Sequence, residues 1–316
     1  MTVAFLFPGQ GAQGEGLLHQ LPQHAEVTRT LTEASAVLGL DLGALDNAQA
    51  QHSTAAVQVG LLVAGVATAR ALMAEQVRPG AVAGMSVGAF GAAVACGTLS
   101  FADALRLVRL RGELMQAAFP SGYGLAALVG LDEGRVEGLV ERVRTMERPV
   151  YVSNINAPRQ IVVAGSDAAL SAVTTLALQH GARRVDRLAV SVPSHCPLLQ
   201  PVADRLARAM ATLPLRPPGV PYVSNRGGRA LRDADAIRED LATNIAHPVR
   251  WCDTLEVLGE LGATLFLEMA PGHVSTQLIA QLLPGVRAVS IADRGLRYAA
   301  VVAAREDSSD FRSSVP

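Results

Sequence analysis

The stretch AVAGMSVGAFGAAV, residues 81–94, carries the strongest structural signal in the chain. A short apolar run predicts a strand, which leads through Gly84-Met85-Ser86-Val87-Gly88 into a helix of small residues. This is the context of a nucleophile elbow, in which flanking glycines let backbone approach a serine held in a strained turn. The amino end of the helix would direct N–H groups at the same point, and the Val87 N–H would stabilise an oxyanion. A packed turn without chemistry has the same local pattern, so this stretch alone leaves both alternatives open.

Apolar strands alternate with helical patterns on both sides of this stretch, which indicates a parallel sheet covered by helices. The expected strands of this core are residues 3–7, 81–84, 220–224, 264–269 and 286–291. The expected helices before residue 120 lie near 16–38, 55–77, 87–96 and 101–119. We therefore predict an α/β fold with a parallel-sheet core.

Residues 122–193 follow a different order, in which strands and helices spell βαββαβ. That is the order of a ferredoxin-like unit. We predict a small subdomain here, inserted between the two parts of the core, residues 1–121 and 194–300. The tail, residues 301–316, is polar and aperiodic, so we expect it to be disordered.

The composition excludes several classes of function. The formal charge of −1 and the aromatic content of 4% disfavour nucleic-acid binding. All 27 basic residues are arginine, which excludes a Schiff-base lysine and the lysine of a phosphate-binding loop. The three cysteines lie far apart, which indicates reduced thiols in the cytoplasm and no metal site.

Two further patterns have ordinary explanations. Residues 55–74 approach the length of a membrane span, but they carry Gln58 and Arg70, so we predict a buried core helix and no membrane association. GQGAQG at 9–14 fits the dinucleotide fingerprint, which also needs a second strand that ends in an acidic residue about 20 positions on. Residues 27–38 keep a helical pattern instead. We therefore expect no nucleotide site.

A catalytic serine needs a general base, and His195 is the best placed of the seven histidines. It lies in SVPSHCP between Pro193 and Pro197, whose rings restrict the backbone and so fix the direction of the imidazole. A histidine with only a packing role remains the alternative.

Arg111 falls near the middle of the apolar face of the helix expected at 101–119. A guanidinium that faces the core must find an anion, because an unpaired buried charge is very costly. The anion is either an internal Asp or Glu or the carboxylate of a substrate.

Six segments together resemble the malonyl-CoA:acyl-carrier-protein transacylase family, in matching order and across nearly the whole chain. They are FPGQGAQ (7–13), GMSVG (84–88), RLRGELMQ (109–116), VSVPSHCPLL (190–199), HPVRW (247–251) and LEMAPGHV (267–274). The resemblance implies a hydrolase-like α/β core interrupted by a ferredoxin-like subdomain, with the active site between the two. It also implies malonyl-CoA as substrate, no bound cofactor or metal, and an acyl-carrier protein with a phosphopantetheine-type arm as partner.

The same resemblance assigns roles to particular residues. Ser86 corresponds to the family's nucleophile and His195 to its base. The other site residues that it implies are Gln10 and Val87 for the oxyanion hole, Arg111 for the malonyl carboxylate, and the main-chain carbonyl of Asn244 for orienting the histidine. The reaction expected is ping-pong acyl transfer through a malonyl-serine.

Departures from the family pattern bear on the pathway. Met85 and Ala89 stand where most relatives have His and Glu, and in this respect the elbow is similar to the epsilon subunit of malonate decarboxylase. We therefore expect loading of the carrier subunit of that enzyme, with its other subunits as further partners. A malonyl transferase of fatty-acid or polyketide synthesis is the alternative. Two alternatives of another class have the same fold. A serine esterase or thioesterase would release the free acid to water, and a non-catalytic assembly subunit would form no acyl-enzyme.

Overall fold

The computed structural model describes the backbone of residues 2–313 and the side chains of residues 3–305. Its larger sheet has the strand order β10-β9-β1-β2-β7-β8, and neighbouring strands run parallel except β8, which is antiparallel to β7. The strands are β1 (Thr2–Phe7), β2 (Ala81–Gly84), β7 (Tyr222–Val223), β8 (Ala230–Leu231), β9 (Ala263–Glu268) and β10 (Arg287–Ser290). The predicted parallel-sheet core is confirmed, with β8 as an addition.

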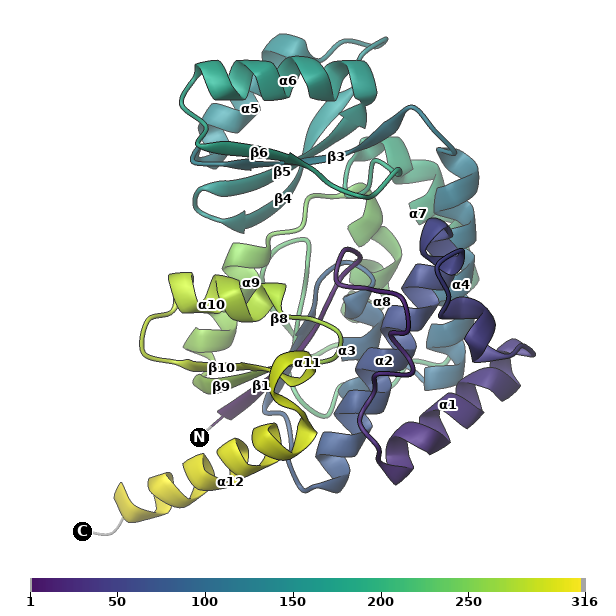
Figure 1. Ribbon diagram of the computed structural model, residues 1–316, viewed down its shortest axis with the longest axis vertical. Coiled ribbons are helices and arrows are strands. Elements are labelled where there is room, and N and C mark those ends of the chain that lie inside the picture. The colour runs from purple at the N-terminus through teal and green to yellow at the C-terminus, as the bar shows by residue number, and fades with distance from the viewer. Residues whose placement is uncertain (1, 314–316) are drawn as a thin grey trace.

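Helices cover both faces of this sheet (Figure 1). The helices of the core are α1 (Ala25–Leu38), α2 (Thr54–Ala74), α3 (Gly88–Ala95), α4 (Phe101–Ala118), α7 (Gln200–Met210), α8 (Ala234–Thr243), α9 (Trp251–Glu260), α10 (Val274–Leu282), α11 (Ile291–Arg294) and α12 (Leu296–Ser313). Side chains alternate along a strand. Phe5 and Phe7 therefore join the apolar cluster of α1 to α4, whereas Leu6 joins the cluster of α9 and α10.

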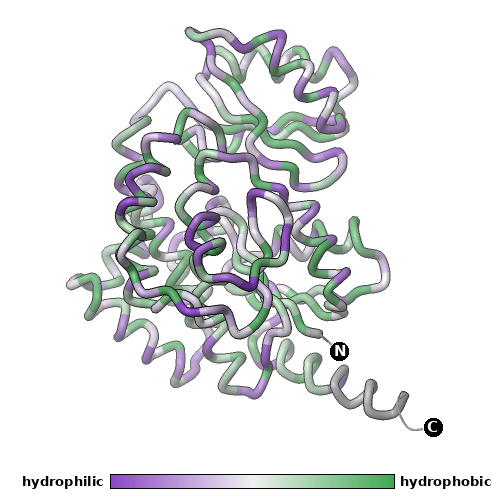
Figure 2. Tube along the Cα trace, turned by 180° about the vertical axis from the view of Figure 1, so that it is seen from behind, coloured by the Kyte–Doolittle hydropathy of each residue, from purple (hydrophilic) through white to green (hydrophobic). Residues whose placement is uncertain are grey.

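The helix α2 is buried on nearly all sides. By length and composition it could span a membrane, but 89% of its most apolar window is buried inside the protein. A helix that is hydrophobic all round belongs in a core, so the prediction of a core helix over 55–74 is confirmed. Hydrophobic and hydrophilic residues are interspersed along much of the chain trace, as Figure 2 shows from behind.

The smaller sheet lies at the top of the molecule in Figure 1, with α5 and α6 on its outer face. Its elements are β3 (Tyr123–Val129), α5 (Glu133–Val143), β4 (Val150–Ala157), β5 (Gln160–Ser166), α6 (Asp167–Gln179) and β6 (Arg184–Arg187). The strand order is β4-β5-β3-β6, and all pairs are antiparallel. The βαββαβ order is therefore as predicted, while the limits of 122 and 193 stay a prediction.

The two sheets are joined by the segment between α8 and α9. The Ile155 N–H of β4 donates to the Val249 carbonyl at 2.8 Å, and the Val249 N–H donates to the Ser153 carbonyl at 2.8 Å. Arg250 adds an ion pair with Glu133 of α5, at 2.7 Å. This segment therefore anchors the edge strand of the small sheet to the core.

Two expectations need correction. The helix expected near 16–38 begins only at Ala25, because the His24 side chain caps it by accepting from the Glu26 N–H at 3.0 Å. The tail was expected to be disordered from residue 301, but α12 continues to Ser313. Ala299, Val302 and Ala303 recur at helical spacing and are buried, which extends the helix into the polar sequence. Residues 314–316 lie outside the described residues.

Candidate active site

Ser86 lies in the turn between β2 and α3 with a φ of 55°. The positions that flank Ser86 require glycine, because neighbouring main-chain atoms lie too close to leave room for a side chain. A Cβ at Gly84 would lie 2.1 Å from the Gly88 carbonyl carbon, and one at Gly88 would lie 2.3 Å from the Phe7 carbonyl oxygen. A non-glycine residue at such a φ is disfavoured unless its surroundings hold it. The strand, turn and helix that the Gly-x-Ser-x-Gly spacing predicts are therefore present, with the serine in the strained position.

His195 is brought to this serine from a segment 109 residues away. Its Nε2 lies 2.7 Å from Ser86 Oγ, and its Nδ1 lies 2.8 Å from the Asn244 carbonyl oxygen. A carbonyl only accepts, so Nδ1 carries the proton and Nε2 is the acceptor for the serine hydroxyl. His195 also has a positive φ, of 61°, and its N–H donates to the Ile245 carbonyl at 2.7 Å.

The imidazole of His195 is held in its neutral form. Burial and the neighbouring Arg111 charge lower the pKa of His195 to about 3, against a smaller opposing effect of main-chain hydrogen bonds. At neutral pH the base is therefore unprotonated at Nε2 and able to accept a proton.

Arg111 is fully buried and has no acidic partner among the described side chains. Its Nη1 donates to Gln58 Oε1 at 2.7 Å, and its Nη2 donates to Ser86 Oγ at 3.1 Å. Its Nε, also buried, has no partner. Burial lowers the pKa of Arg111 to about 9, which leaves it charged at neutral pH. An internal Asp or Glu, one of the two alternatives, has no candidate in the described region, so the cation can take an anion from outside.

Val87 belongs to the elbow itself, and Gln10 follows Gly9, which packs against the elbow. Val87 directly precedes the first residue of α3. Gln10 begins a turn after β1, and a Cβ at the preceding Gly9 would be 3.0 Å from the Met85 carbonyl oxygen. Gln58 reaches the Gln10 side chain, with Nε2 to Oε1 at 3.5 Å. Within residues 2–313, neither main-chain N–H donates a hydrogen bond to another group. Both are therefore available to a ligand beside Ser86.

Two further residues at the site carry weaker sequence signals. Gln58 stood out only as an amide in an apolar helix, yet it accepts from Arg111 and is buried. Asn225 directly follows the strand expected at 220–224, and its amide contacts the elbow. Ser86 N–H donates to Asn225 Oδ1 at 2.8 Å, and Asn225 Nδ2 donates to the Gly84 carbonyl at 2.7 Å. Neither contact follows from spacing along the chain.

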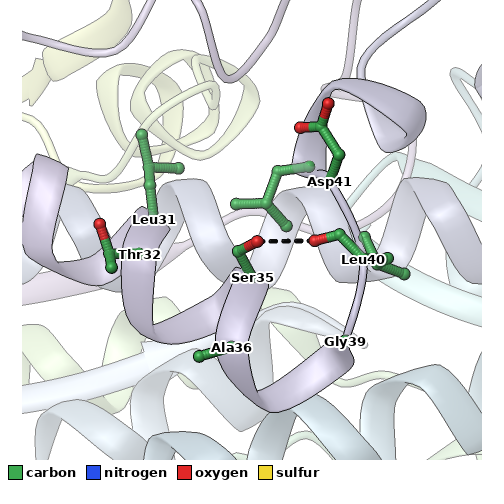
Figure 3. A pocket seen from close by; sticks show the side chains of 8 residues that line it. Leu31, Thr32, Ser35, Ala36, Gly39, Leu40 and Asp41 are labelled. Atoms are coloured by element: carbon green, nitrogen blue, oxygen red, sulfur yellow. Dashed lines mark hydrogen bonds between the residues drawn. The ribbon is translucent and has the colours of Figure 1, made fainter.

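Two other places in the described structure bring polar side chains together. Cys252, Asp253 and Glu256 bring potential metal ligands together, but Asp253 is paired with Arg250, and burial raises the pKa of the Cys252 thiol to about 12. A surface pocket beside α1 is drawn in Figure 3, and there Ser35 Oγ already donates to the Leu40 carbonyl at 2.7 Å. At the first place Cys252 Sγ donates to Glu256 Oε1 at 3.6 Å, but the raised pKa keeps this thiol protonated at neutral pH. The absence of a metal stays a prediction.

Comparison with known proteins bears on the chemistry of this site. Residues 4–312 match the model of the acyl transferase domain. The chain belongs to the acyl transferase family. The malonyl CoA-acyl carrier protein transacylase of Escherichia coli strain K12 is 36% identical to this acyltransferase over 304 residues, covering 94% of this chain and 98% of the relative.

Solved structures agree with this family. The malonyl CoA-acyl carrier protein transacylase of Coxiella burnetii superposes with a TM-score of 0.90 at 34% identity, covering 96% of this chain and 98% of that one. A malonyl-transacylase solved in complex with a type II PKS acyl-carrier protein gives a TM-score of 0.90 at 36% identity, over 97% and 100% of the two chains. The resemblance to the malonyl-CoA:acyl-carrier-protein transacylases is thereby confirmed.

Proposed function

We propose that this acyltransferase moves a malonyl group from malonyl-CoA to the thiol of an acyl-carrier protein through a malonyl ester of Ser86. The observation that carries the proposal is Arg111, a buried cation 3.1 Å from Ser86 Oγ with no carboxylate partner among the described residues. A guanidinium in such a place binds a substrate carboxylate strongly and leaves an apolar acyl group without compensation for its charge.

The first half-reaction acylates the serine. His195 Nε2 takes the proton of Ser86 Oγ while that oxygen attacks the thioester carbonyl carbon. The main-chain N–H groups of Gln10 and Val87 donate to the oxyanion that forms. Collapse of the tetrahedral intermediate breaks the carbon–sulfur bond, and the proton on His195 passes to the departing thiolate of coenzyme A.

The second half-reaction reverses these roles. The thiol of the carrier protein's phosphopantetheine arm gives its proton to His195 Nε2 and attacks the ester carbonyl of malonyl-Ser86. The intermediate then expels Ser86 Oγ, which regains the proton. The neutral histidine that burial maintains serves as base in both halves.

The pathway is the finer question, and the comparisons favour fatty-acid or polyketide synthesis over malonate decarboxylase. The relatives compared above bear the name malonyl CoA-acyl carrier protein transacylase, and one structure is of a type II PKS carrier protein with its malonyl-transacylase. We therefore propose a malonyl transferase of fatty-acid or polyketide synthesis, the alternative given above, in place of the malonate decarboxylase role. Association with malonate decarboxylase subunits and a cytoplasmic location stay predictions.

Transfer to a carrier protein requires a docking surface on the enzyme. The arginine-rich segment 183–187 is one candidate for it, but Arg184 pairs with Asp186 at 2.7 Å and Arg187 pairs with Asp167. These two charges are already partly neutralised, so this segment is a weaker candidate than its sequence suggested.

The proposal is tested by following both possible fates of the acyl group. The enzyme is mixed with malonyl-CoA or acetyl-CoA, with and without a holo-acyl-carrier protein, and the carrier's intact mass and the free acid are measured. We expect malonyl transfer to the carrier, little acetyl transfer and slow release of malonate. Rapid malonate release without transfer would support the serine esterase instead, and equal use of acetyl-CoA would contradict the role of Arg111.

A further inference from the structure

We infer that Asn225 is a positioning residue, whose side-chain amide holds the elbow in the conformation that aims Ser86 Oγ at His195. The inference rests on the proposed role of Ser86 as nucleophile and adds a residue that acts only through it. The Asn225 amide bonds to the main chain on both sides of Met85 and forms no hydrogen bond with the side chains of His195 or Arg111.

The amide continues a sheet ladder past the point where the strands separate. β2 pairs with β7 in parallel, through Val82 with Tyr222 and Ala83 with Val223. Beyond Ala83 the chain of β2 turns into the elbow, and the Asn225 side chain takes the place of a neighbouring peptide group. It accepts from the Ser86 N–H at 2.8 Å and donates to the Gly84 carbonyl at 2.7 Å.

These two bonds restrain the strained serine. With a φ of 55°, Ser86 occupies a region that costs free energy for a residue with a side chain. Without the amide, its partly buried N–H and the Gly84 carbonyl would lose their partners, and rotation of the turn would relieve the strain. Such a rotation would carry Oγ away from its 2.7 Å contact with His195 Nε2.

Asn225 is itself fixed in place. It is fully buried, and its main-chain carbonyl accepts from the Arg250 N–H at 2.8 Å. The buried Asp240 accepts from the Tyr222 hydroxyl at 2.8 Å and, more weakly, from the Asn225 N–H at 3.4 Å. The amide is therefore held by the end of β7 and by α8 and does not follow the elbow if the elbow moves.

Removal of the amide should slow the chemistry and leave substrate binding nearly unchanged. For Asn225→Ala we expect acylation of Ser86 to fall about 100-fold, the size of effect that a displacement of about 1 Å produces. KM for malonyl-CoA should change little, because Arg111 and Gln58 keep their contact. If Asn225 had only a structural role, Asn225→Ala would lower the melting temperature but would not lower kcat while KM stayed constant.

Asn225→Asp provides a sharper readout. An ionised Asp at this position accepts from the Ser86 N–H but repels the Gly84 carbonyl, whereas a protonated one restores both the acceptor and the donor. Burial and the nearby Asp240 carboxylate would raise the pKa of the new carboxyl. Acylation by Asn225→Asp should therefore rise as the pH falls from about 8 to about 6, a range in which Asn225→Ala and the parent enzyme change little.

The experiment measures two rates of Ser86 modification by intact mass. One reagent is malonyl-CoA, and the other is phenylmethanesulfonyl fluoride, from which Ser86 Oγ displaces fluoride at sulfur without any need for the malonyl site. Asn47→Ala removes an exposed asparagine and serves as the matched control. We expect both rates to fall in Asn225→Ala and to stay at the parent value in Asn47→Ala.

The outcomes separate this inference from the proposed function. Parent-like rates in a folded Asn225→Ala, or a flat pH profile in Asn225→Asp, would overturn the inference, and the Asp variant decides it if the Ala variant does not fold. A parent enzyme that reacts with the sulfonyl fluoride but not with malonyl-CoA would contradict the proposed function alone. A parent enzyme that reacts with neither would contradict both.

Discussion

The elbow that carries Ser86 and the loop that carries His195 hold their residues in different ways. Both residues have a positive φ. The elbow requires two positions without a side chain, Gly84 and Gly88, and it requires the side-chain amide of Asn225. The imidazole of His195 is instead oriented by the main-chain carbonyl of Asn244, which accepts from Nδ1. The main-chain N–H of His195 donates to the carbonyl of Ile245. Substitutions should therefore disrupt the elbow easily, whereas the orientation of the histidine should tolerate them.

Ser86→Ala should have the largest effect, because it removes the atom that carries the acyl group. We expect malonyl transfer to the carrier to fall by about 10⁴-fold or more. The melting temperature should stay close to the parent value, since the Ser86 N–H bond to Asn225 does not need the hydroxyl. Near-parent transfer by a folded variant would remove Ser86 from the mechanism.

Gly88→Ala should break the elbow as a structure. Its Cβ would lie 2.3 Å from the Phe7 carbonyl oxygen and 2.7 Å from that of Pro8, both main-chain atoms that cannot yield cheaply. We expect the free energy of unfolding to fall by about 3 kcal/mol or more. Gly138→Ala is the matched control, since nothing lies within 4 Å of its Cβ and it lies inside α5, where alanine is favoured. Equal denaturation midpoints for the two variants would be inconsistent with this packing.

Arg111→Ala should change the choice of acyl group more than the rate of the underlying chemistry. We expect malonyl transfer to fall by about 100-fold and acetyl transfer to rise, because the buried cation no longer requires a carboxylate. Competition between malonyl-CoA and acetyl-CoA in one reaction measures the ratio directly. An unchanged ratio would mean that the anion bound by Arg111 is not the acyl group.

The pH dependence tests the electrostatic link between Arg111 and His195. Because the pKa of His195 is lowered to about 3, the base is already neutral well below pH 7. The rate of Ser86 acylation should therefore stay nearly constant from about pH 5 to about pH 8. Removal of the Arg111 charge removes one cause of the lowering, so the acid limb of Arg111→Ala should move to higher pH. If the rate of acylation falls at the same acidic pH in both enzymes, burial alone sets the pKa of His195.

Asn244→Ala should have the smallest effect and so sharpens the comparison with Asn225→Ala. Its contact with His195 uses the main-chain carbonyl, which alanine keeps, while the atoms of its own buried side-chain amide have no partner among the described groups. We expect acylation within about 3-fold of the parent, as for substitutions away from a critical feature. A loss as large as that of Asn225→Ala would contradict the distinction between side-chain and main-chain support.

The sequence predicts the elbow well because its information is local. Strand, glycine spacing and helix lie within 14 residues, and period and composition reveal them directly. The alternation of strands and helices likewise predicts both sheets. The start of the tail differs from the prediction because Val302 and Ala303 of α12 are buried through tertiary contacts, which the polar sequence around them does not reveal.

The contacts between residues of the site could not be predicted from the sequence in the same way. Nothing in the spacing of residues shows that Asn225 reaches Ser86 or that Gln58 reaches Arg111, since each pair is separated by more than 50 positions and depends on the assembled sheet. The sequence does indicate His195 as the candidate base for Ser86, because Pro193 and Pro197 restrict its backbone, and the resemblance to a family then assigns it that role. The helical position of Arg111 did predict its burial, because a single buried charge in an amphipathic pattern is a local signal.

The most direct test of malonyl transfer through Ser86 is to trap and map the acyl-enzyme. The protein is mixed with malonyl-CoA in the absence of a carrier, quenched in acid, digested and analysed by mass spectrometry. The account predicts one malonyl group on the peptide that contains Ser86, none in Ser86→Ala, and no corresponding acetyl adduct from acetyl-CoA. A malonyl group on another residue, or a folded protein that carries none, would contradict it.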